Sequence, residues 1–362
     1  MDARLRNDSE MNEKFSEDKR NTLLLAQSFD RLGYDKKANR CYDCGTYMGF
    51  HKSVSDMADE EVDYKLNEAN FCRERLCPMC AKRRSLKIFA QVSKIVDNID
   101  TDKYDFIFLT LTVPNVTGDK LADKISQMQK AFNRLIHYKR FKNAVVGYFR
   151  ALEVTYNHHK NSKSYDTFHP HYHNILVVRK DYFKSSNYIR RSEWLAMWQM
   201  AMNDTSITQV DVRKIIQSMD KKKRGVVSFS TAVAEVAKYT VKSSDYLFKN
   251  NPALTDRVVS VLSSALKGRR LVAFGGLFAD IRELLNLDDA ENGDLIHVET
   301  EEEISKDKLF LVRRWNWLSD THVYNMYEEV VESYAELEER RKRRLEALQK
   351  FYAECRKKVK AA

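Results

Sequence analysis

Residues 106–113 have the sequence FIFLTLTV, a run of aromatic, aliphatic and threonine side chains. Residues of these types are enriched in β-strands, and the turn formers Pro114-Asn115 follow directly. Apolar side chains occur at consecutive positions and do not simply alternate with polar ones. The run therefore predicts a central strand of a sheet that is buried on both faces.

The flanking sequence predicts the rest of this sheet and its helices. Two further strands are expected at about 145–156 and 172–178, and the polar connection between them predicts antiparallel pairing. Alternating residues at 208–215 indicate a fourth strand, and helical spacing appears at 120–138, 192–203 and 230–248. This order of elements predicts an α+β fold in which helices cover one face of an antiparallel sheet.

Charge and composition favour a polyanionic partner. The 362 residues contain 62 lysines and arginines against 52 acidic residues, a net charge of +10. The first 20 residues are highly charged and lack the apolar core of a signal peptide, and no apolar run is long enough to cross a membrane. We therefore expect a soluble cytoplasmic protein with no membrane partner.

Shifts in composition predict four regions. These are a polar arm at 1–40, a cysteine-rich module at 41–90, a main domain at 91–250 and an accessory helical region at 251–362. The last region has helical spacing from Tyr327 to Lys360 amid dense charge. Three roles stay open for this helix: a solvated helix packed on the body, a contact in a homodimer, and a DNA-binding helix.

Clustered cysteines indicate a structural metal. Two C-x2-C pairs lie close together in the chain, and four thiolates at this spacing suit tetrahedral Zn²⁺. The predicted ligands are Cys41, Cys44, Cys77 and Cys80, with Cys72 as an alternative. Such a closed site has no open coordination position for catalysis. Basic side chains flank it and are candidates for phosphate contacts, namely Arg73, Arg75, Lys82, Arg83 and Arg84.

A histidine-rich strand start indicates a second metal site. Residues 169–173 are HPHYH, and side chains two apart on a strand share a face, so His171 and His173 point the same way. Glu153, on the neighbouring predicted strand, is the candidate third ligand, with a solvent-facing glutamate as the alternative. A carboxylate with two imidazoles suits Mn²⁺ or Mg²⁺.

An acid, a phenol and an amine share a face of the helix predicted at 230–248. Glu235, Tyr239, Lys242 and Tyr246 are spaced i, i+4, i+7 and i+11. A phenolate is a credible nucleophile for phosphorus when a base or a cation lowers its pKa. An exposed polar network is the alternative explanation.

Taken together, these segments resemble motifs of the plasmid rolling-circle replication initiators of the HUH endonuclease superfamily. Residues 108–112 resemble the first motif, 169–173 the metal motif, and 235–246 the tyrosine motif E-x3-Y-x2-K-x2-D-Y. The cysteine segment that ends at 76–80 also recurs in that family. The resemblance implies an HUH-endonuclease-like antiparallel sheet covered by helices, with an N-terminal zinc-ribbon-like module and a helical C-terminal region.

The resemblance also implies a mechanism. Tyr239 would cut one strand of the plasmid origin, presented single-stranded or as a hairpin, leaving a 5′-phosphotyrosyl enzyme and a free 3′-OH primer. His171 and His173 would hold the divalent metal, and Lys242 would neutralise phosphate charge or help deprotonate the phenol. Glu235 would be the general base for hydrolysis at termination. Host helicase and DNA polymerase are the implied partners.

Two other functions remain as alternatives. A transposase or conjugative relaxase of the same superfamily would share the nicking step. A non-catalytic zinc-containing DNA-binding regulator would leave the strand histidines and Tyr239 without a common purpose.

Overall fold

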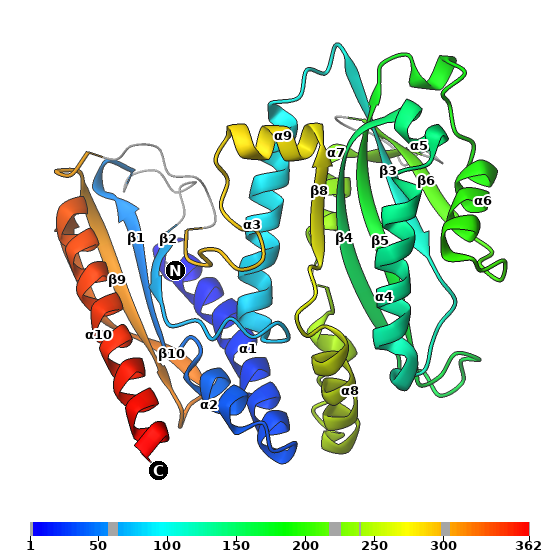
Figure 1. Ribbon diagram of the computed structural model, residues 1–362. Helices are drawn as coiled ribbons and strands as arrows, with labels where there is room; N and C mark the ends of the chain where they lie inside the picture. The colour runs from blue at the N-terminus through cyan, green and yellow to red at the C-terminus, as the bar shows by residue number, and fades with distance from the viewer. Residues whose placement is uncertain (1–2, 57–63, 217–225, 239, 298–304, 362) are drawn as a thin grey trace. The chain divides into compact units, whose positions relative to one another are not determined.

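The computed structural model describes residues 3–56, 64–216, 226–238, 240–297 and 305–361 (Figure 1). The chain divides into two compact units, one of residues 1–20, 42–72 and 300–362 and one of residues 21–41 and 73–299. These units do not follow the boundaries at 40, 90 and 250 that composition predicts. None of the described helices is long and apolar enough to cross a membrane.

The second unit is built on a six-stranded sheet of order β7-β6-β3-β5-β4-β8. Its strands are β3 (Tyr104–Thr112), β4 (Val145–Asn157), β5 (Thr167–Arg179), β6 (Val210–Ile216), β7 (Val226–Ser228) and β8 (Val272–Gly276). The structure confirms that the FIFLTLTV run is a central strand and that β4 and β5 pair antiparallel. The sheet is not purely antiparallel, because β6 and β7 run parallel.

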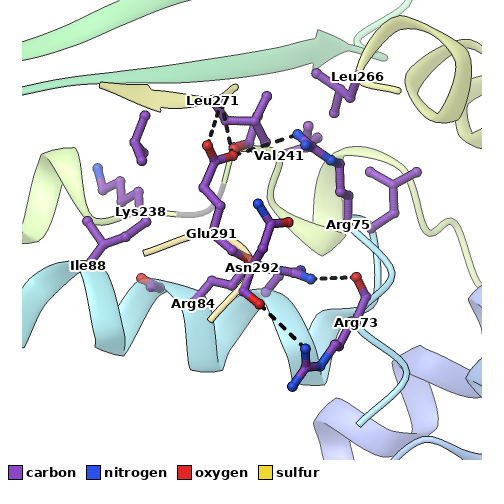
Figure 2. Close-up of a pocket in the computed structure, with 15 residues that line it drawn as sticks. Arg73, Arg75, Arg84, Ile88, Lys238, Val241, Leu266, Leu271, Glu291 and Asn292 are labelled. Atoms are coloured by element: carbon purple, nitrogen blue, oxygen red, sulfur yellow. Dashed lines mark hydrogen bonds and ion pairs between the residues drawn. The ribbon is translucent and has the colours of Figure 1, made fainter. Parts of the chain in front are cut away.

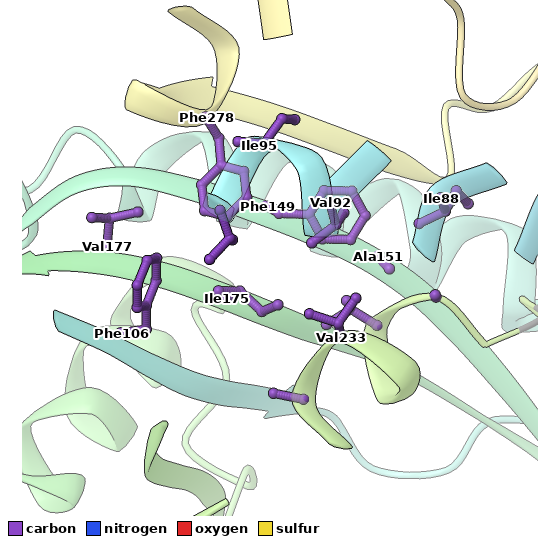
Figure 3. Packing of buried hydrophobic residues seen from close by; sticks show 14 of the residues in the cluster. Ile88, Val92, Ile95, Phe106, Phe149, Ala151, Ile175, Val177, Val233 and Phe278 are labelled. Atoms are coloured by element: carbon purple, nitrogen blue, oxygen red, sulfur yellow. The ribbon is translucent and has the colours of Figure 1, made fainter. Parts of the chain in front are cut away.

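Helices cover both faces of this sheet, so the prediction of a single covered face is wrong. On one face Phe132 packs edge-on against Tyr148 and Tyr172, with ring centroids 5.3 and 5.8 Å apart. The other face packs against apolar side chains such as Val92, Val233 and Phe278 (Figure 3). The physical reason is that β4 and β5 carry buried residues at consecutive positions, and both sides must be shielded from water.

The helices and short 3-10 turns of this unit lie between the strands in the chain. They are α3 (Pro78–Asp97), α4 (Gly118–Leu135), α5 (Lys139–Ala144), η2 (Tyr182–Lys184), α6 (Arg191–Met202), α7 (Phe229–Val236), η3 (Ser243–Asp245), α8 (Pro252–Ala265) and α9 (Leu277–Leu284). The helices predicted at 120–138 and 192–203 are confirmed as α4 and α6. Two N-terminal helices, α1 (Ala3–Arg31) and α2 (Asp35–Asp43), contain residues of both units.

The helix predicted over 230–248 is much shorter in the structure. α7 ends at Val236, and the hydroxyl of Ser85 donates a hydrogen bond to the carbonyl of Ala237 just beyond it. Further on, the carbonyl of Thr240 accepts a hydrogen bond from the backbone N–H of Val154 on β4, at 2.7 Å. The helix ends because the edge of β4 needs acceptors for its N–H groups, and this chain segment supplies one.

The first unit contains a four-stranded antiparallel sheet of order β10-β9-β1-β2. Its elements include β1 (Tyr47–Ser53), η1 (Val54–Asp56), β2 (Lys65–Ala69), β9 (Leu309–Leu318), β10 (Val323–Ser333) and α10 (Tyr334–Ala361). Leu337 on α10 is buried against Phe310 and Val312 of β9.

The C-terminal region predicted to be helical contains α8, α9 and α10, but it also contains the three strands β8, β9 and β10, which the sequence did not predict. The helix predicted from Tyr327 begins only at Tyr334. β9 forms by pairing with β1, which is distant in sequence, and a local periodicity pattern does not register such a partner.

Candidate metal and nucleophile site

The two predicted histidines and Glu153 meet on one face of the second unit's sheet. Glu153 on β4 lies directly across from His171 on β5 in the strand register. The Oε2 atom of Glu153 is 3.2 Å from Nε2 of His171 and 2.8 Å from Nε2 of His173. All three residues are buried, so Glu153 is not the solvent-facing glutamate of the alternative explanation. One ligand atom from each lies within 4.8 Å of the others, which is close enough to share a metal ion.

Neighbouring groups orient both imidazoles. The Nδ1 atom of His173 lies 3.2 Å from the hydroxyl of Thr110, and Phe108 stacks on the ring with centroids 5.5 Å apart. The Nδ1 atom of His171 lies 3.2 Å from the carbonyl oxygen of His169. These contacts at Nδ1 fix each ring so that Nε2 faces Glu153, where it can bind a metal ion once it is deprotonated.

The carboxylate of Glu153 stays charged in this environment. Burial favours its neutral form, but the hydrogen bonds and charges of His171 and His173 outweigh burial and hold the pKa of Glu153 well below its usual value. Metal binding requires a deprotonated carboxylate, so this electrostatic setting suits a divalent cation.

His169 occupies a neighbouring position but does not belong to this ligand group. Its ring stacks on that of His171 with centroids 5.2 Å apart. Burial, followed by the charge of His171, lowers the pKa of His169 and favours its neutral form.

Glu235 is also at this site. It lies in the last turn of α7, and its Oε1 atom is 3.7 Å from Nε2 of His173. Its other carboxylate oxygen pairs with the ammonium group of Lys238. Lys238 was not among the site residues predicted from the sequence, although its i, i+3 spacing from Glu235 was a usable signal.

Tyr239 lies outside the residues that the structure describes, so its predicted role is not tested by the geometry. Its neighbours in sequence are described. Lys238 pairs with Glu235, and Thr240 bonds to Val154, the residue after Glu153. Both neighbours thus contact residues at or beside the metal-ligand group.

Lys242 and Tyr246 do not share a helical face with Glu235, because α7 ends before them. The side chain of Lys242 is exposed. Tyr246 is buried, and its hydroxyl donates to the carbonyl of Leu76. Tyr246 therefore has a structural contact within the second unit.

Asp245 is a further acidic residue near the site that the sequence analysis did not single out. It lies in η3 and is half-buried. Burial raises the pKa of Asp245, and the charge of Glu153 contributes in the same direction. Asp245 could have been predicted from the sequence, because it is the aspartate of the D-Y pair in the tyrosine motif.

Both units contain buried cysteines. In the first unit, Cys44 and Cys72 are buried, and the backbone N–H of Cys72 donates to the sulfur of Cys44 at 3.4 Å. In the second unit Cys41, Cys77 and Cys80 are buried, and the N–H of Arg73 donates to the sulfur of Cys80 at 3.3 Å. Backbone donors of this kind stabilise thiolate charge.

Arg83 and Arg84, two of the predicted phosphate-binding residues, donate to several backbone carbonyl oxygens of the protein. Arg83 donates to the carbonyl oxygens of Leu295 and Ile296 at 2.8 and 2.5 Å. Arg84 donates to those of Glu291 and Glu74, both at 3.0 Å. They attach the chain around 291–296 to α3, a tertiary role that a run of basic residues does not reveal. Lys82 is half-buried on the same helix.

Comparison with known proteins agrees with the motif resemblance. A profile of the family described as Replication protein matches residues 63–324. Protein rep of Bacillus amyloliquefaciens is 38% identical over 303 residues, covering 79% of this chain and 86% of the relative. Protein rep of a Bacillus species is 40% identical over 276 residues, covering 73% and 86%.

A third relative, Protein rep of Streptococcus pneumoniae, is 34% identical over 300 residues, covering 82% of this chain and 87% of the relative. No solved structure matches the chain. The extent of the profile match and these relatives show that the chain belongs to the Replication protein family.

Proposed function

We propose that this protein initiates plasmid rolling-circle replication by nicking one origin strand with Tyr239. The observation that carries the proposal is the buried group of Glu153, His171 and His173, with Glu235 3.7 Å from His173. A purely structural cluster has no need of a second acidic side chain at the histidines. Membership of the Replication protein family supports the same reading.

The donor set fits a divalent cation. One carboxylate and two imidazoles, oriented by hydrogen bonds at their far nitrogens, suit Mn²⁺ or Mg²⁺. Bound there, the ion would supply Lewis acidity toward the scissile phosphate. Glu153, His171 and His173 would hold it in place.

In the proposed first step, the phenolate oxygen of Tyr239 forms a bond to phosphorus and the bond from phosphorus to the 3′-oxygen breaks. The leaving 3′-oxygen takes up a proton and becomes the primer that a host polymerase extends, with a host helicase opening the duplex. Of the two lysines in the motif region, Lys238 has the better support as the cation near Tyr239, because it pairs with Glu235. The assignment of Lys242 depended on a helix that ends at Val236.

The direct test is a covalent adduct assay. The full chain is incubated with Mn²⁺ and a labelled single strand carrying the plasmid origin, and protein-linked label is measured after denaturation. Adduct that depends on both the origin sequence and Mn²⁺ is the expected result. If no adduct forms on any strand of the plasmid, nicking is excluded and the non-catalytic DNA-binding regulator replaces it.

Glu235 is proposed as the general base for water at termination. Replacing it with glutamine should leave formation of the first adduct within about threefold of wild type, while hydrolytic release falls by roughly 10²-fold or more, the usual range for a lost general base. The measurement is a chase of preformed adduct, followed as release of labelled strand. Equal release rates for wild type and Glu235→Gln would remove this role.

We further propose, from the spacing of its two C-x2-C pairs, that the cysteine segment binds one structural Zn²⁺. The contact from Cys72 to the sulfur of Cys44 supports Cys72, the alternative ligand, in place of Cys41. Structural zinc sites hold four protein ligands and contribute directly to folding.

This ligand choice predicts opposite behaviour of two matched variants. Cys72→Ser should lose bound zinc and unfold at a lower temperature, whereas Cys41→Ser should keep about one zinc ion per chain. Zinc is measured by elemental analysis of the purified chain, alongside its melting temperature. The reverse pattern would restore Cys41 as the ligand and leave Cys72 outside the site.

A further inference from the structure

A pocket in the second unit lies where α3 meets the chain segments around 238–241, 266–272 and 291–292 (Figure 2). Four cationic side chains line it, Arg73, Arg75, Arg84 and Lys238, and a single carboxylate, that of Glu291. Leucine, isoleucine and valine side chains form most of the remaining wall. The free volume is about 90 Å³.

The carboxylate of Glu291 is already occupied within the protein. The backbone N–H of Leu271 lies 3.0 and 3.1 Å from its two oxygens, as Figure 2 shows. Nη1 of Arg75 is 3.8 Å from the nearer oxygen, an ion-pair distance that is too long for a hydrogen bond. Glu291 is thus held by the backbone at Leu271, and its carboxylate offsets one of the four positive charges of the pocket.

Arg75 carries the feature that points to a ligand. Its Nη1 atom is buried and has no hydrogen-bond partner among the residues that the structure describes. Burial lowers the pKa of Arg75, and the charge of Glu291 opposes this shift. A buried donor without an acceptor raises the free energy of the folded protein. A ligand that supplies an acceptor would remove this cost, which favours its binding.

The other two arginines leave positive charge in the pocket. Arg84 donates to the carbonyl oxygens of Glu291 and Glu74, and Arg73 donates to that of Asn292 at 3.4 Å. Carbonyl oxygens satisfy the donors without cancelling the charge. The pocket therefore favours an anion.

The pocket adjoins the candidate site through Lys238. Lys238 and Thr240, on either side of Tyr239 in sequence, both line it. Lys238 also pairs with Glu235, which reaches to 3.7 Å from His173.

We propose that this pocket binds a backbone phosphate of the single strand, close to but distinct from the phosphate that is cut, with Arg75 as its principal ligand. This inference rests on the proposed function, since it takes DNA as the substrate. A phosphate presents only acceptors, which matches a wall whose open groups are donors. A nucleobase is neutral, so the excess of positive side chains in the pocket favours a phosphate over a base.

The test combines Arg75→Gln with a scan of neutral methylphosphonate groups along an origin oligonucleotide. Binding is measured without divalent metal and in the Tyr239→Phe background, so no cleavage is involved. At one position of the oligonucleotide, the neutral group should weaken DNA binding by the Tyr239→Phe parent about tenfold. The same group should hardly change DNA binding by the Arg75→Gln variant, because that variant has already lost the contact to this phosphate. The logarithm of the DNA-binding constant decreases with the logarithm of the salt concentration, and in Arg75→Gln this slope should be shallower by about 0.7.

Two further variants keep the result interpretable. Arg179→Gln removes the same charge from an exposed position at the end of β5 and should keep both the sensitive position and the salt slope. Asn292→Asp is nearly isosteric, adds a negative charge to the pocket, and should weaken binding at the same phosphate while all arginines remain. Melting temperatures show which variants are folded.

Two outcomes would overturn the inference. One is that Arg75→Gln and Arg179→Gln respond to every methylphosphonate just as the parent does. The other is that abasic substitution, and not phosphate neutralisation, is coupled to Arg75, which would make the pocket a base-binding site. Because adduct formation is assayed separately with intact Tyr239, failure here is distinguishable from failure of the nicking proposal.

Discussion

Replacing Tyr239 with phenylalanine is expected to abolish the covalent protein–DNA adduct. Phenylalanine keeps the ring and removes only the oxygen that would attack phosphorus, so the nicking rate should fall by roughly 10³-fold or more. The measurement is protein-linked label after incubation with Mn²⁺ and the origin strand. DNA binding should be nearly unchanged, because the proposed phosphate and metal contacts do not involve the phenol.

The matched control for this variant is Tyr246→Phe. Tyr246 is the other tyrosine of the motif, and its buried hydroxyl donates to the carbonyl of Leu76. Its removal leaves that carbonyl without this donor and should lower stability by about 1–3 kcal/mol while adduct still forms. An adduct that survives in Tyr239→Phe and disappears in a folded Tyr246→Phe would transfer the nucleophile to Tyr246.

Replacing His173 with alanine is expected to cause the second large loss. The ring of His173 contacts Glu153 at 2.8 Å and lies 3.7 Å from Glu235, so its removal takes away one ligand and loosens both acids. Affinity for Mn²⁺ should fall by about 100-fold or more, since even the loss of an outer partner costs 10- to 100-fold. Calorimetric titration with Mn²⁺ measures this directly, and nicking should decline in parallel.

His169→Ala is the control, because His169 stacks beside His171 but supplies no atom to the ligand group. It should retain Mn²⁺ affinity within a few-fold. The variant Glu153→Gln should behave like His173→Ala, since the amide keeps the shape of the carboxylate and removes its charge. Unchanged Mn²⁺ affinity in both His173→Ala and Glu153→Gln would rule out this metal site.

Local sequence patterns were sufficient to predict many of the strands and helices of the second unit. The two-residue period of a strand predicts that His171 and His173 share a face, and the observed strand β5 agrees. The FIFLTLTV run predicts a central strand because only a strand covered on both sides accommodates consecutive apolar residues. Both inferences depend on residues close together in the chain, so no knowledge of distant partners was needed.

Contacts between distant segments were decided only in the folded chain. Glu153 could be placed on a strand from the sequence, but its position opposite His171 depends on the register of β4 against β5. The helical spacing of residues 235–246 was misleading, because the edge of β4 binds the carbonyl of Thr240 and α7 ends at Val236. Helical periodicity measures which faces are apolar, and it contains no information on which backbone groups a neighbouring strand requires.

The arginines near the cysteines show most clearly which features can be predicted from local sequence and which depend on contacts between distant segments. A basic segment beside the cysteines is evident from the sequence alone, and it predicts a chain suited to bind nucleic acid. The folded chain places Arg83 and Arg84 as donors to carbonyl oxygens around 291–296, while Nη1 of Arg75 is a buried donor with no acceptor among the described residues. The physical reason is that a charge is a property of one residue, whereas a hydrogen bond needs two groups that folding brings together.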